Sequence, residues 1–332
     1  MRVCVLMPAL DVFKGGNHLP LLAALKDVRF TIVTNRVKPR DIELPANVEV
    51  QTLGERIGPY YYGIADYLYA RALLRRHPPR DVFWKQFDVI HINQAMGPAL
   101  SRLRETGVPV CFFIHHPVSA DRTIVLEESS GFERLRWRLK YAFLVRWQKR
   151  LCRAFPHIVT VSHTAADRIA RDYGCERSKV HVVPNGVDTE VFAPGDLSQS
   201  EFDVTALGAF VHPRKGFRYL LEVYRALSAH GLRIADAVRR SPEQMQALRA
   251  IPGVQVLGTV PEERLLSLLR QSSVLVSTSL YEGFGLSLVE ALACGRPAVA
   301  FDGGAVREVL EPIDPSLVVA LRDTGALADR VL

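Results

Sequence analysis

The sequence predicts an α/β protein with two doubly wound, Rossmann-like domains, each built around a parallel sheet. Short apolar segments rich in β-branched residues alternate with helical segments along the whole chain. Strands that are apolar along their full length are typical of parallel sheets that helices cover on both faces. A chain of 332 residues is also long for a single hydrophobic core, so two domains are expected.

In the first half, apolar runs and helical periodicity define the expected elements. The expected strands are Arg2–Met7, Phe30–Thr34, Val48–Thr52, Val89–Asn93, Pro109–His115, Ile158–Ser162 and Val180–Pro184. The expected helices are Ala65–Arg76, Arg134–Arg153 and Thr164–Tyr173. The apolar N-terminal run is too short to span a bilayer, and Asp11 follows it where a signal peptide would still be apolar.

The second half repeats the pattern. The expected strands are Val204–Gly208, Val254–Leu257, Val274–Ser277, Pro297–Phe301 and Leu317–Ala320. The expected helices are Phe217–His230, Pro242–Ala250, Glu262–Gln271, Leu286–Ala293 and Ala305–Leu310.

The domain boundary is expected just after the last strand of the first half. Asn185-Gly186 is a turn signal, and Pro184 and Pro194 bracket a segment with neither helical nor strand periodicity. We therefore expect an N-terminal domain over residues 1–184, a linker over 185–202 and a C-terminal domain over 203–332.

Charge is distributed unevenly along the chain. Residues 1–190 contain 28 Lys and Arg against 19 Asp and Glu, whereas residues 191–332 contain 14 against 16. A basic half suits a nucleic acid, an anionic lipid or a phosphorylated substrate. Nucleic-acid binding rests on charge alone, because no nucleic-acid motif accompanies it, and no nucleic-acid partner is expected.

The five cysteines point to a reducing compartment. They lie at positions 4, 111, 152, 175 and 294, with no Cys-x-x-Cys and no metal-ligand spacing. An odd, scattered set is typical of reduced thiols in a cytoplasmic protein. We expect a cytoplasmic location, with attachment to the inner membrane surface left open, and no bound metal.

The stretch Tyr281–Ala300, YEGFGLSLVEALACGRPAVA, carries the clearest chemistry. Gly283 and Gly285 allow close backbone approach to a ligand, and the helix that follows offers free N–H groups at its positive end. That arrangement suits a diphosphate. Glu290, inside the helix, has the carboxylate needed to accept hydrogen bonds from a ribose diol. A glycine-rich turn followed by a helix with one solvated glutamate is the structural alternative.

The stretch resembles the signature of the retaining glycosyltransferases of family 4, which share the two-domain GT-B fold. Further segments resemble motifs of that family in the same order along the chain. They are FDVIHIN, VPVCFFIHH, IVTVSHTAADRI, PNGVDTEVFAP and FDGGAVREVL. The resemblance spans most of the chain. It implies a GT-B fold, with the two Rossmann-like domains facing each other across a cleft.

The resemblance also implies residue roles. Glu290 is expected to bind the nucleotide ribose, and Glu282 to contact hydroxyls of the donor sugar. The backbone N–H groups of Gly283, Phe284 and Gly285 are expected to hold sugar and phosphate.

Residues of the N-terminal half are implicated in the same way. His115 matches the histidine that lines the catalytic cleft of the family, although the neighbouring His116 is an alternative. Gly15 and Gly16 match the N-terminal glycine loop that reaches the diphosphate.

A second phosphate-binding element is expected at Leu207–Phe217, LGAFVHPRKGF. The family usually has Gly-Arg at the strand end and Lys-Gly at the next helix start. Lys215-Gly216 matches this pattern. Ala209 stands where the arginine is expected, and Arg214 is the candidate to supply that charge.

The resemblance implies a retaining, metal-independent hexosyltransferase that needs no cofactor beyond its nucleoside-diphosphate sugar donor. Cations and backbone donors stabilise the charge that develops on the leaving diphosphate. In the proposed front-face mechanism, a phosphate oxygen of the leaving group takes the proton of the acceptor hydroxyl.

The acceptor is expected to be a hydroxyl group on a glycan, a small molecule, or a lipid-linked or phosphorylated compound. The basic helix at 132–153 has eight Lys and Arg. Its apolar residues are spread around the helical wheel, which favours a packed helix over a membrane-surface helix. Peripheral membrane contact stays open as the alternative.

Two departures from the family pattern bear on activity. The chain is expected to be shortened at its C-terminus, and GLRIADAVRRSP, residues 231–242, is expected to lack the strand that in the family ends in Val-Gly-x-Gly. The alternative function is therefore a non-catalytic relative that binds a sugar nucleotide or a glycan.

Overall fold

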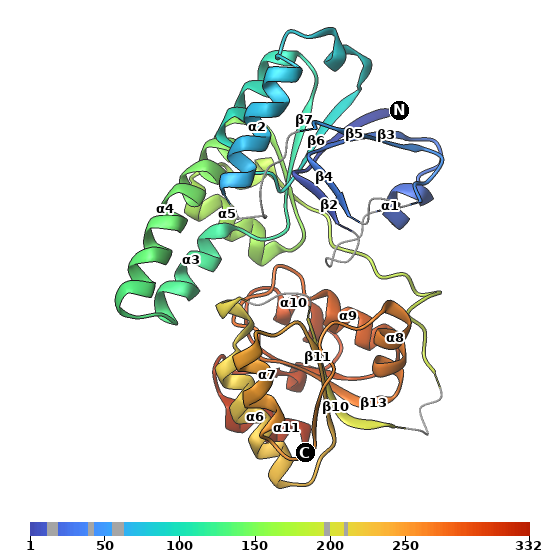
Figure 1. Ribbon diagram of the computed structural model, residues 1–332, viewed down its shortest axis with the longest axis vertical. Coiled ribbons are helices and arrows are strands. Elements are labelled where there is room, and N and C mark those ends of the chain that lie inside the picture. The colour runs from blue at the N-terminus through green and yellow to red at the C-terminus, as the bar shows by residue number, and fades with distance from the viewer. Residues whose placement is uncertain (12–18, 39–42, 55–62, 196–199, 209–211) are drawn as a thin grey trace. The chain divides into compact units, whose positions relative to one another are not determined.

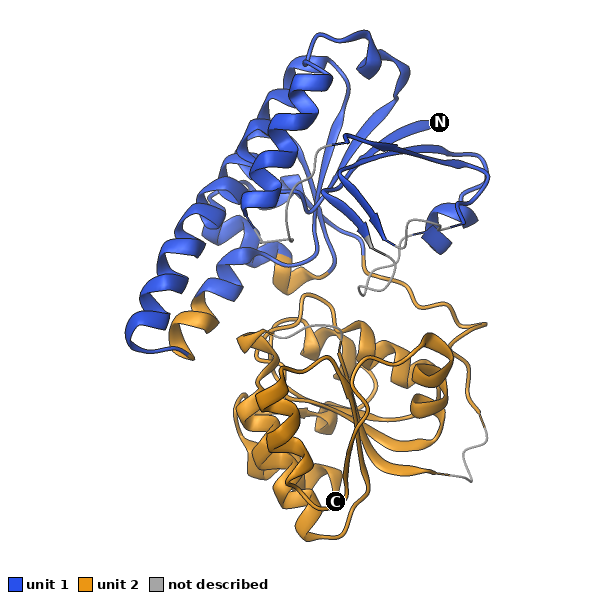
Figure 2. Ribbon diagram, viewed as in Figure 1, with its two compact units in different colours: residues 1–122, 129–161, 166–183 blue, residues 123–128, 162–165, 184–332 orange. Residues whose placement is uncertain are grey.

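The computed structural model describes most of the chain as two compact units. It covers residues 1–11, 19–38, 43–54, 63–195, 200–208 and 212–332. The first unit comprises Met1–Arg122, Ser129–Val161 and Ala166–Val183, and the second comprises Thr123–Glu128, Ser162–Ala165 and Pro184–Leu332 (Figure 2).

The first unit is built on a seven-stranded sheet with the order β5-β3-β1-β6-β7-β8-β9. All its strand pairs are parallel. The strands are β1 (Arg2–Leu6), β3 (Arg29–Thr34), β5 (Val48–Thr52), β6 (Val89–Asn93), β7 (Val110–Ile114), β8 (His157–Thr160) and β9 (Val180–Val182). A separate parallel pair is formed by β2 (Ala9–Asp11) and β4 (Arg36–Lys38).

Helices cover both faces of this sheet, with α2 and α4 on one side and α1 on the other (Figure 1). The helices in this part of the chain are α1 (Leu19–Ala24), α2 (Ile64–Arg76), α3 (Val118–Glu127), α4 (Gly131–Ala154) and α5 (His163–Tyr173). The core between α2 and the sheet is aromatic, since Tyr69, Trp84 and Phe112 are fully buried. Tyr69 donates its hydroxyl to the Val33 carbonyl at 2.7 Å, so its polar end is satisfied inside the core.

The second unit contains a six-stranded parallel sheet with the order β12-β11-β10-β13-β14-β15. Its strands are β10 (Phe202–Gly208), β11 (Ile234–Val238), β12 (Val254–Val256), β13 (Ser272–Ser277), β14 (Ala298–Phe301) and β15 (Val318–Val319). Its helices are α6 (Phe217–Ala229), α7 (Pro242–Arg249), α8 (Glu262–Arg270), α9 (Leu286–Ala293), α10 (Val306–Leu310) and α11 (Thr324–Val331). Figure 1 shows α6 and α11 on one face and α8 and α9 on the other.

The expected class of fold, an α/β protein with two parallel sheets, is confirmed. Every strand and helix expected from the sequence is present, with ends that shift by a few residues; α4, for example, begins at Gly131 and ends at Ala154.

The expectation for residues 231–242 is wrong about the strand, because β11 occupies Ile234–Val238 in the middle of the sheet, between β10 and β12. The Val-Gly-x-Gly ending is absent, since Arg239 and Arg240 follow Val238. All five residues of β11 are buried. Asp236 interrupts the apolar run that would have signalled this strand, and its charge is neutralised by Arg240, whose Nη2 atom lies 2.7 Å from the Asp236 carboxylate.

Both sheets reverse their winding at an identifiable place. In the first unit β1 is followed outward by β3 and β5, and the chain then returns to add β6 on the other side of β1. In the second unit β10 lies between β11 and β13 in the same way. Ligands of open parallel sheets bind beyond the carboxyl ends of the strands at such switch points. The sheet order therefore places the candidate site of the second unit beyond β10 and β13.

Candidate functional site

Three loops meet at the carboxyl edge of the second sheet. They follow β10, β13 and β14, which are hydrogen-bonded to one another in the order β10-β13-β14. Because neighbouring parallel strands end at the same edge, residues far apart in sequence become neighbours there. The Leu280 N–H donates to the Arg214 carbonyl at 2.7 Å, which fastens the β13 loop to the β10 loop.

An ion pair joins the same two loops. The Lys215 ammonium lies 2.5 Å from Oε1 of Glu282, and Nη1 of Arg214 lies 3.6 Å from Oε2. All three side chains are largely buried, with exposed fractions of 20% for Lys215, 13% for Glu282 and 6% for Arg214. From the sequence, Arg214, Lys215 and Glu282 were separate candidates. In the structure both cations contact the Glu282 carboxylate.

Arg214 has a second contact that fixes its direction. Its Nη1 atom donates to the Tyr281 carbonyl at 2.9 Å. The guanidinium therefore points into the β13 loop, where it also contacts the Glu282 carboxylate from the buried side. Lys215 is the more exposed of the two cations, so it is better placed to meet an anion arriving from solvent.

The surroundings of Glu282 keep its carboxyl ionised. Burial raises its pKa, but the charges of Lys215 and Arg214 and hydrogen bonds from Lys215 and Ser279 lower it more, and the pKa is about 2. At neutral pH Glu282 is therefore an acceptor of hydrogen bonds and not a proton donor.

Two glycines allow the loops to approach this closely. A Cβ atom on Gly216 would lie 2.0 Å from the Thr278 carbonyl oxygen, and one on Gly304 would lie 2.3 Å from the Glu282 carbonyl oxygen. Both have a positive φ, 63° and 69° respectively. The Ala305 N–H donates to the Glu282 carbonyl at 2.9 Å, so the β14 loop holds the Glu282 backbone in place.

Helix α9 begins directly after this loop. Gly283 and Gly285 are buried and Phe284 is half-buried. Gly285 is the residue before the helix, in the left-handed conformation with φ 96°, and has no side chain to cap the first turn. The glycine-rich loop and the helix start predicted from the sequence are therefore present at the carboxyl edge of the sheet.

Glu290 lies in the middle of α9, and its environment differs from that of Glu282. Burial raises the pKa of its carboxyl, and the nearby Glu262 carboxylate of α8 raises it further, to about 7. Burial and the charge of Glu262 therefore destabilise the ionised form of Glu290. A bound group that donates hydrogen bonds to it would relieve that cost.

His115 lies at the corresponding edge of the first sheet, directly after β7. Its Nε2 atom lies 3.2 Å from Oδ1 of Asn93, which ends the neighbouring strand β6. Its backbone N–H donates to Oε1 of Gln94 at 3.0 Å. Gln94 has a φ of 51°, a conformation that non-glycine residues rarely adopt and that often marks functional sites.

His116 is engaged differently, because its Nε2 atom lies 3.1 Å from the Asp121 carboxylate of α3. Asn93 and Gln94 were not identified from the sequence. Asn93 ends an expected strand and Gln94 directly follows it, and this position is the signal that would have found them. Gly15 and Gly16 lie outside the described residues.

Asp236 and Arg240 form a buried polar cluster near the start of α6. This cluster was not identified from the sequence. The Tyr224 hydroxyl donates to Asp236 at 3.3 Å, and the Arg240 guanidinium lies 5.1 Å from the ring centre of Phe217. Because Phe217 begins α6, this cluster anchors the start of the helix that follows Lys215 and Gly216.

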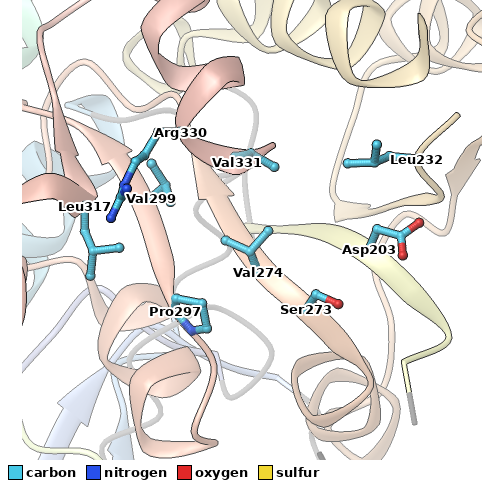
Figure 3. Close-up of a pocket in the computed structure, with 9 residues that line it drawn as sticks. All are labelled: Asp203, Leu232, Ser273, Val274, Pro297, Val299, Leu317, Arg330 and Val331. Carbon is cyan, nitrogen blue, oxygen red and sulfur yellow. The ribbon is translucent and has the colours of Figure 1, made fainter. Parts of the chain in front are cut away.

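A pocket of about 380 Å³ lies elsewhere in the second unit (Figure 3). Asp203, Ser273 and Pro297 lie at or just before the amino ends of β10, β13 and β14, and Arg330 and Val331 of α11 complete the lining. It is therefore at the edge opposite to Lys215 and Glu282. We assign the site to the carboxyl edge, because ligands of such sheets bind there and the charged groups converge there.

Among the described residues, no group of three or more His, Cys, Asp or Glu side chains is arranged to hold a metal ion. No helix in the described part of the chain has the length and apolar character needed to cross a membrane.

Both halves of the chain match models of glycosyltransferase families. Residues 21–191 match the family model described as Glycosyltransferase Family 4, and residues 201–332 match the model described as Glycosyl transferases group 1. An MMP alpha-(1->4)-mannosyltransferase of Mycolicibacterium hassiacum is 34% identical over 68% of this chain and 56% of its own length. A D-inositol 3-phosphate glycosyltransferase of Acidothermus cellulolyticus is 26% identical over 79% of this chain and 62% of its own. The matched part thus spans about three fifths of the length of these relatives.

Solved structures agree on the fold. Sucrose-phosphate synthase from Thermosynechococcus elongatus aligns with a TM-score of 0.76 at 17% identity, over 100% of this chain and 88% of that one. WaaG, a glycosyltransferase involved in lipopolysaccharide biosynthesis, aligns with a TM-score of 0.70 at 15% identity, over 99% and 90%. Anabaena Alr3699/HepE, solved in complex with UDP and glucose, aligns with a TM-score of 0.68 at 17% identity, over 100% and 89%. The expected GT-B fold is confirmed.

Proposed function

Because the chain belongs to glycosyltransferase family 4, we propose that it is a retaining glycosyltransferase that transfers a hexose from a nucleoside-diphosphate sugar to a hydroxyl acceptor. The observation that carries the proposal is the convergence of Lys215, Glu282 and the start of α9 at the switch point of the second sheet. A cation, a hydrogen-bond acceptor and free helix N–H groups are the three kinds of group that a sugar diphosphate requires.

The diphosphate would bind to the ammonium of Lys215 and to the first N–H groups of α9. Charge accumulates on this group as the bond to the sugar breaks, and preorganised donors stabilise it, each by roughly 3 kcal/mol. Arg214 acts from behind by holding the Glu282 carboxylate and the Tyr281 carbonyl in position. The acceptor proton would pass to a phosphate oxygen of the leaving group, and no protein carboxylate is assigned as nucleophile.

The two glutamates would take different parts of the donor. Glu282, ionised at all but very low pH, would accept hydrogen bonds from hydroxyls of the sugar. Glu290 would accept hydrogen bonds from the nucleotide ribose, and this would favour its ionised form. His115, held by Asn93, would line the acceptor side of the reaction. Protein groups supply all the positive charge in this scheme, and no metal is assigned a step.

The names of relatives suggest which donors and acceptors to test first. The relative from Mycolicibacterium hassiacum is named as a mannosyltransferase, and HepE was solved with UDP and glucose. Other relatives are named for phosphatidyl-myo-inositol and 2-deoxystreptamine acceptors. Mannose and glucose donors, tested against glycan and lipid-linked hydroxyl acceptors, are therefore the first choices.

The experiment is a thermal-shift panel of uridine, guanosine and adenosine diphosphate sugars, followed by an assay for released nucleoside diphosphate. A donor that binds the native state raises the melting temperature. Lys215→Ala and Glu290→Ala are expected to abolish donor turnover, whereas Arg249→Ala, which removes an exposed cation on α7, should not affect it. Near-normal turnover in either site variant would contradict the proposal.

One observation favours a second candidate function, a non-catalytic relative that binds a sugar nucleotide or a glycan. Ala209 stands where the family has a phosphate arginine, and the Arg214 guanidinium is directed to Tyr281 and Glu282. A raised melting temperature with a donor, but no transfer and no hydrolysis with any acceptor tested, would support this second function.

A further inference from the structure

Helix α4 has two apolar faces, and only one of them is packed. Tyr141, Leu144 and Leu151 are buried on one face. Four other apolar side chains are exposed to solvent: Phe132 by 82%, Leu135 by 50%, Leu139 by 57% and Phe143 by 56%. We call these four residues the exposed stripe. Nothing among the described residues covers it.

The exposed stripe is continuous. Its members are three, four and four residues apart, which places them within an arc of roughly 80° on an α-helix and along roughly 17 Å of its axis. Isolated exposed apolar residues are common on protein surfaces, but four in line on one helix are not.

Cations border and extend the exposed stripe. The helix has eight Lys and Arg residues and one acidic residue, Glu133. Arg136, beside the stripe, is exposed by 64%. Arg146 is exposed and lies within about 40° of the centre of the same arc, one turn beyond Phe143. Such side chains extend their charged ends past an apolar surface while their stems lie along it.

The helical wheel of this helix does not separate packed from exposed apolar side chains, because it treats all of them as one set. Trp137, Tyr141, Leu144 and Trp147 belong to buried or half-buried positions. Once they are set aside, the exposed apolar side chains share one side of the helix. The packed face agrees with the expectation of a packed helix, and the exposed side leaves room for the membrane contact that the sequence left open.

We propose that α4 binds the surface of an anionic phospholipid bilayer through the exposed stripe, lying in the plane of the membrane. The apolar side chains would enter the region between head groups and acyl chains, and the flanking arginines would meet lipid phosphates. A ratio of eight cations to one anion favours a uniformly anionic surface over a protein partner of mixed charge. The inference does not depend on the donor site, which lies in the second unit.

The test is co-sedimentation of the protein with vesicles of phosphatidylcholine alone or mixed with phosphatidylglycerol. Wild-type protein is expected to bind the mixed vesicles about tenfold more tightly than the neutral ones, and less tightly as salt rises. The triple variant Leu135→Gln/Leu139→Gln/Phe143→Gln is expected to lose at least about tenfold in affinity.

Two matched variants make the result specific. Val82→Gln/Ile313→Gln removes apolar side chains that are exposed by 76% and 64% outside α4, and it should bind vesicles like wild type. Arg136→Gln/Arg146→Gln keeps the exposed stripe and should lose most of the preference for anionic vesicles. Circular dichroism and the donor thermal shift report whether each variant is folded.

The proposal is overturned if wild type ignores both kinds of vesicle, or if the folded triple variant binds as wild type does. It is also overturned if wild type is a dimer that the triple variant converts to a monomer, without vesicle binding in either form. That last result would assign the exposed stripe to a second copy of the chain.

Discussion

The Lys215 ammonium and the Glu282 carboxylate lie 2.5 Å apart, although 67 residues separate them in the chain. The pair joins the loops that follow β10 and β13. A sugar diphosphate would have to share Lys215 with Glu282. Binding and stability are therefore coupled at this pair.

Glu282→Gln is expected to destabilise the protein by about 3 kcal/mol at pH 7. The folded-state pKa of Glu282 is about 2, below the ordinary value of 4.5, so ionised Glu282 contributes stability above pH 4.5 that is lost as pH falls through 2. Urea unfolding from pH 7 to pH 2 should show a flatter profile in the variant than in wild type. Glu263→Gln, at an exposed position of α8, is the control, and an equal loss of stability there would contradict the assignment.

Glu290→Gln is expected to change the free energy of unfolding in the opposite direction from Glu282→Gln. The folded-state pKa of Glu290 is about 7 and its ordinary value is 4.5, so wild type loses stability as pH rises from 4.5 to 7 and the unfolded chain ionises first. At pH 8 the variant should therefore be more stable by up to about 3 kcal/mol, with no difference below pH 4.5.

The same Glu290 variant should bind the donor more weakly, because the amide replaces the ribose-binding carboxylate. Urea unfolding at pH 4.5 and pH 8 tests the first effect, and the donor thermal shift at pH 8 tests the second. A variant that is less stable than wild type at pH 8 would show that the carboxylate is not destabilised by burial.

Gly304→Ala is expected to damage both stability and donor binding, whereas Gly258→Ala should affect stability alone. Both glycines have a φ of 69°, so each substitution costs about 1–2 kcal/mol in the left-handed region. Only at Gly304 does the new Cβ meet backbone, 2.3 Å from the Glu282 carbonyl oxygen; at Gly258 nothing lies within 4 Å. Equal melting temperatures and equal donor shifts in the two variants would refute a role for this contact.

Arg240→Met is expected to cost about 3–5 kcal/mol, because it leaves the Asp236 carboxylate buried without its partner. Asp236 is fully buried and the Arg240 side chain is exposed by only 5%. The double variant Asp236→Asn/Arg240→Met should recover much of the loss. A double-mutant cycle in urea measures the coupling, and additive single effects would mean that the two residues do not stabilise each other.

The strands that position the site were predictable for a physical reason. A strand covered on both faces has to be apolar throughout, so most strands of the two sheets stood out as short apolar runs. Strand β11 did not, because Asp236 interrupts its apolar run. The charge of Asp236 is stabilised inside the sheet by contacts with Tyr224 and Arg240, which lie outside the strand.

By itself the sequence determined the two parallel-sheet domains, the glycine-rich start of α9 and the identity of the charged residues around it, because these depend on local pattern and spacing. The tertiary structure decided which of those residues meet. Strand order sets which loops share an edge, and it is the adjacency of β10 and β13 that turned Lys215 and Glu282 into a pair and gave Glu282 and Glu290 opposite electrostatic environments. Burial likewise divided the apolar residues of α4 into a packed face and an exposed one. A helical wheel gives the direction of each side chain but not the neighbours that it contacts, so the sequence alone could not make this division.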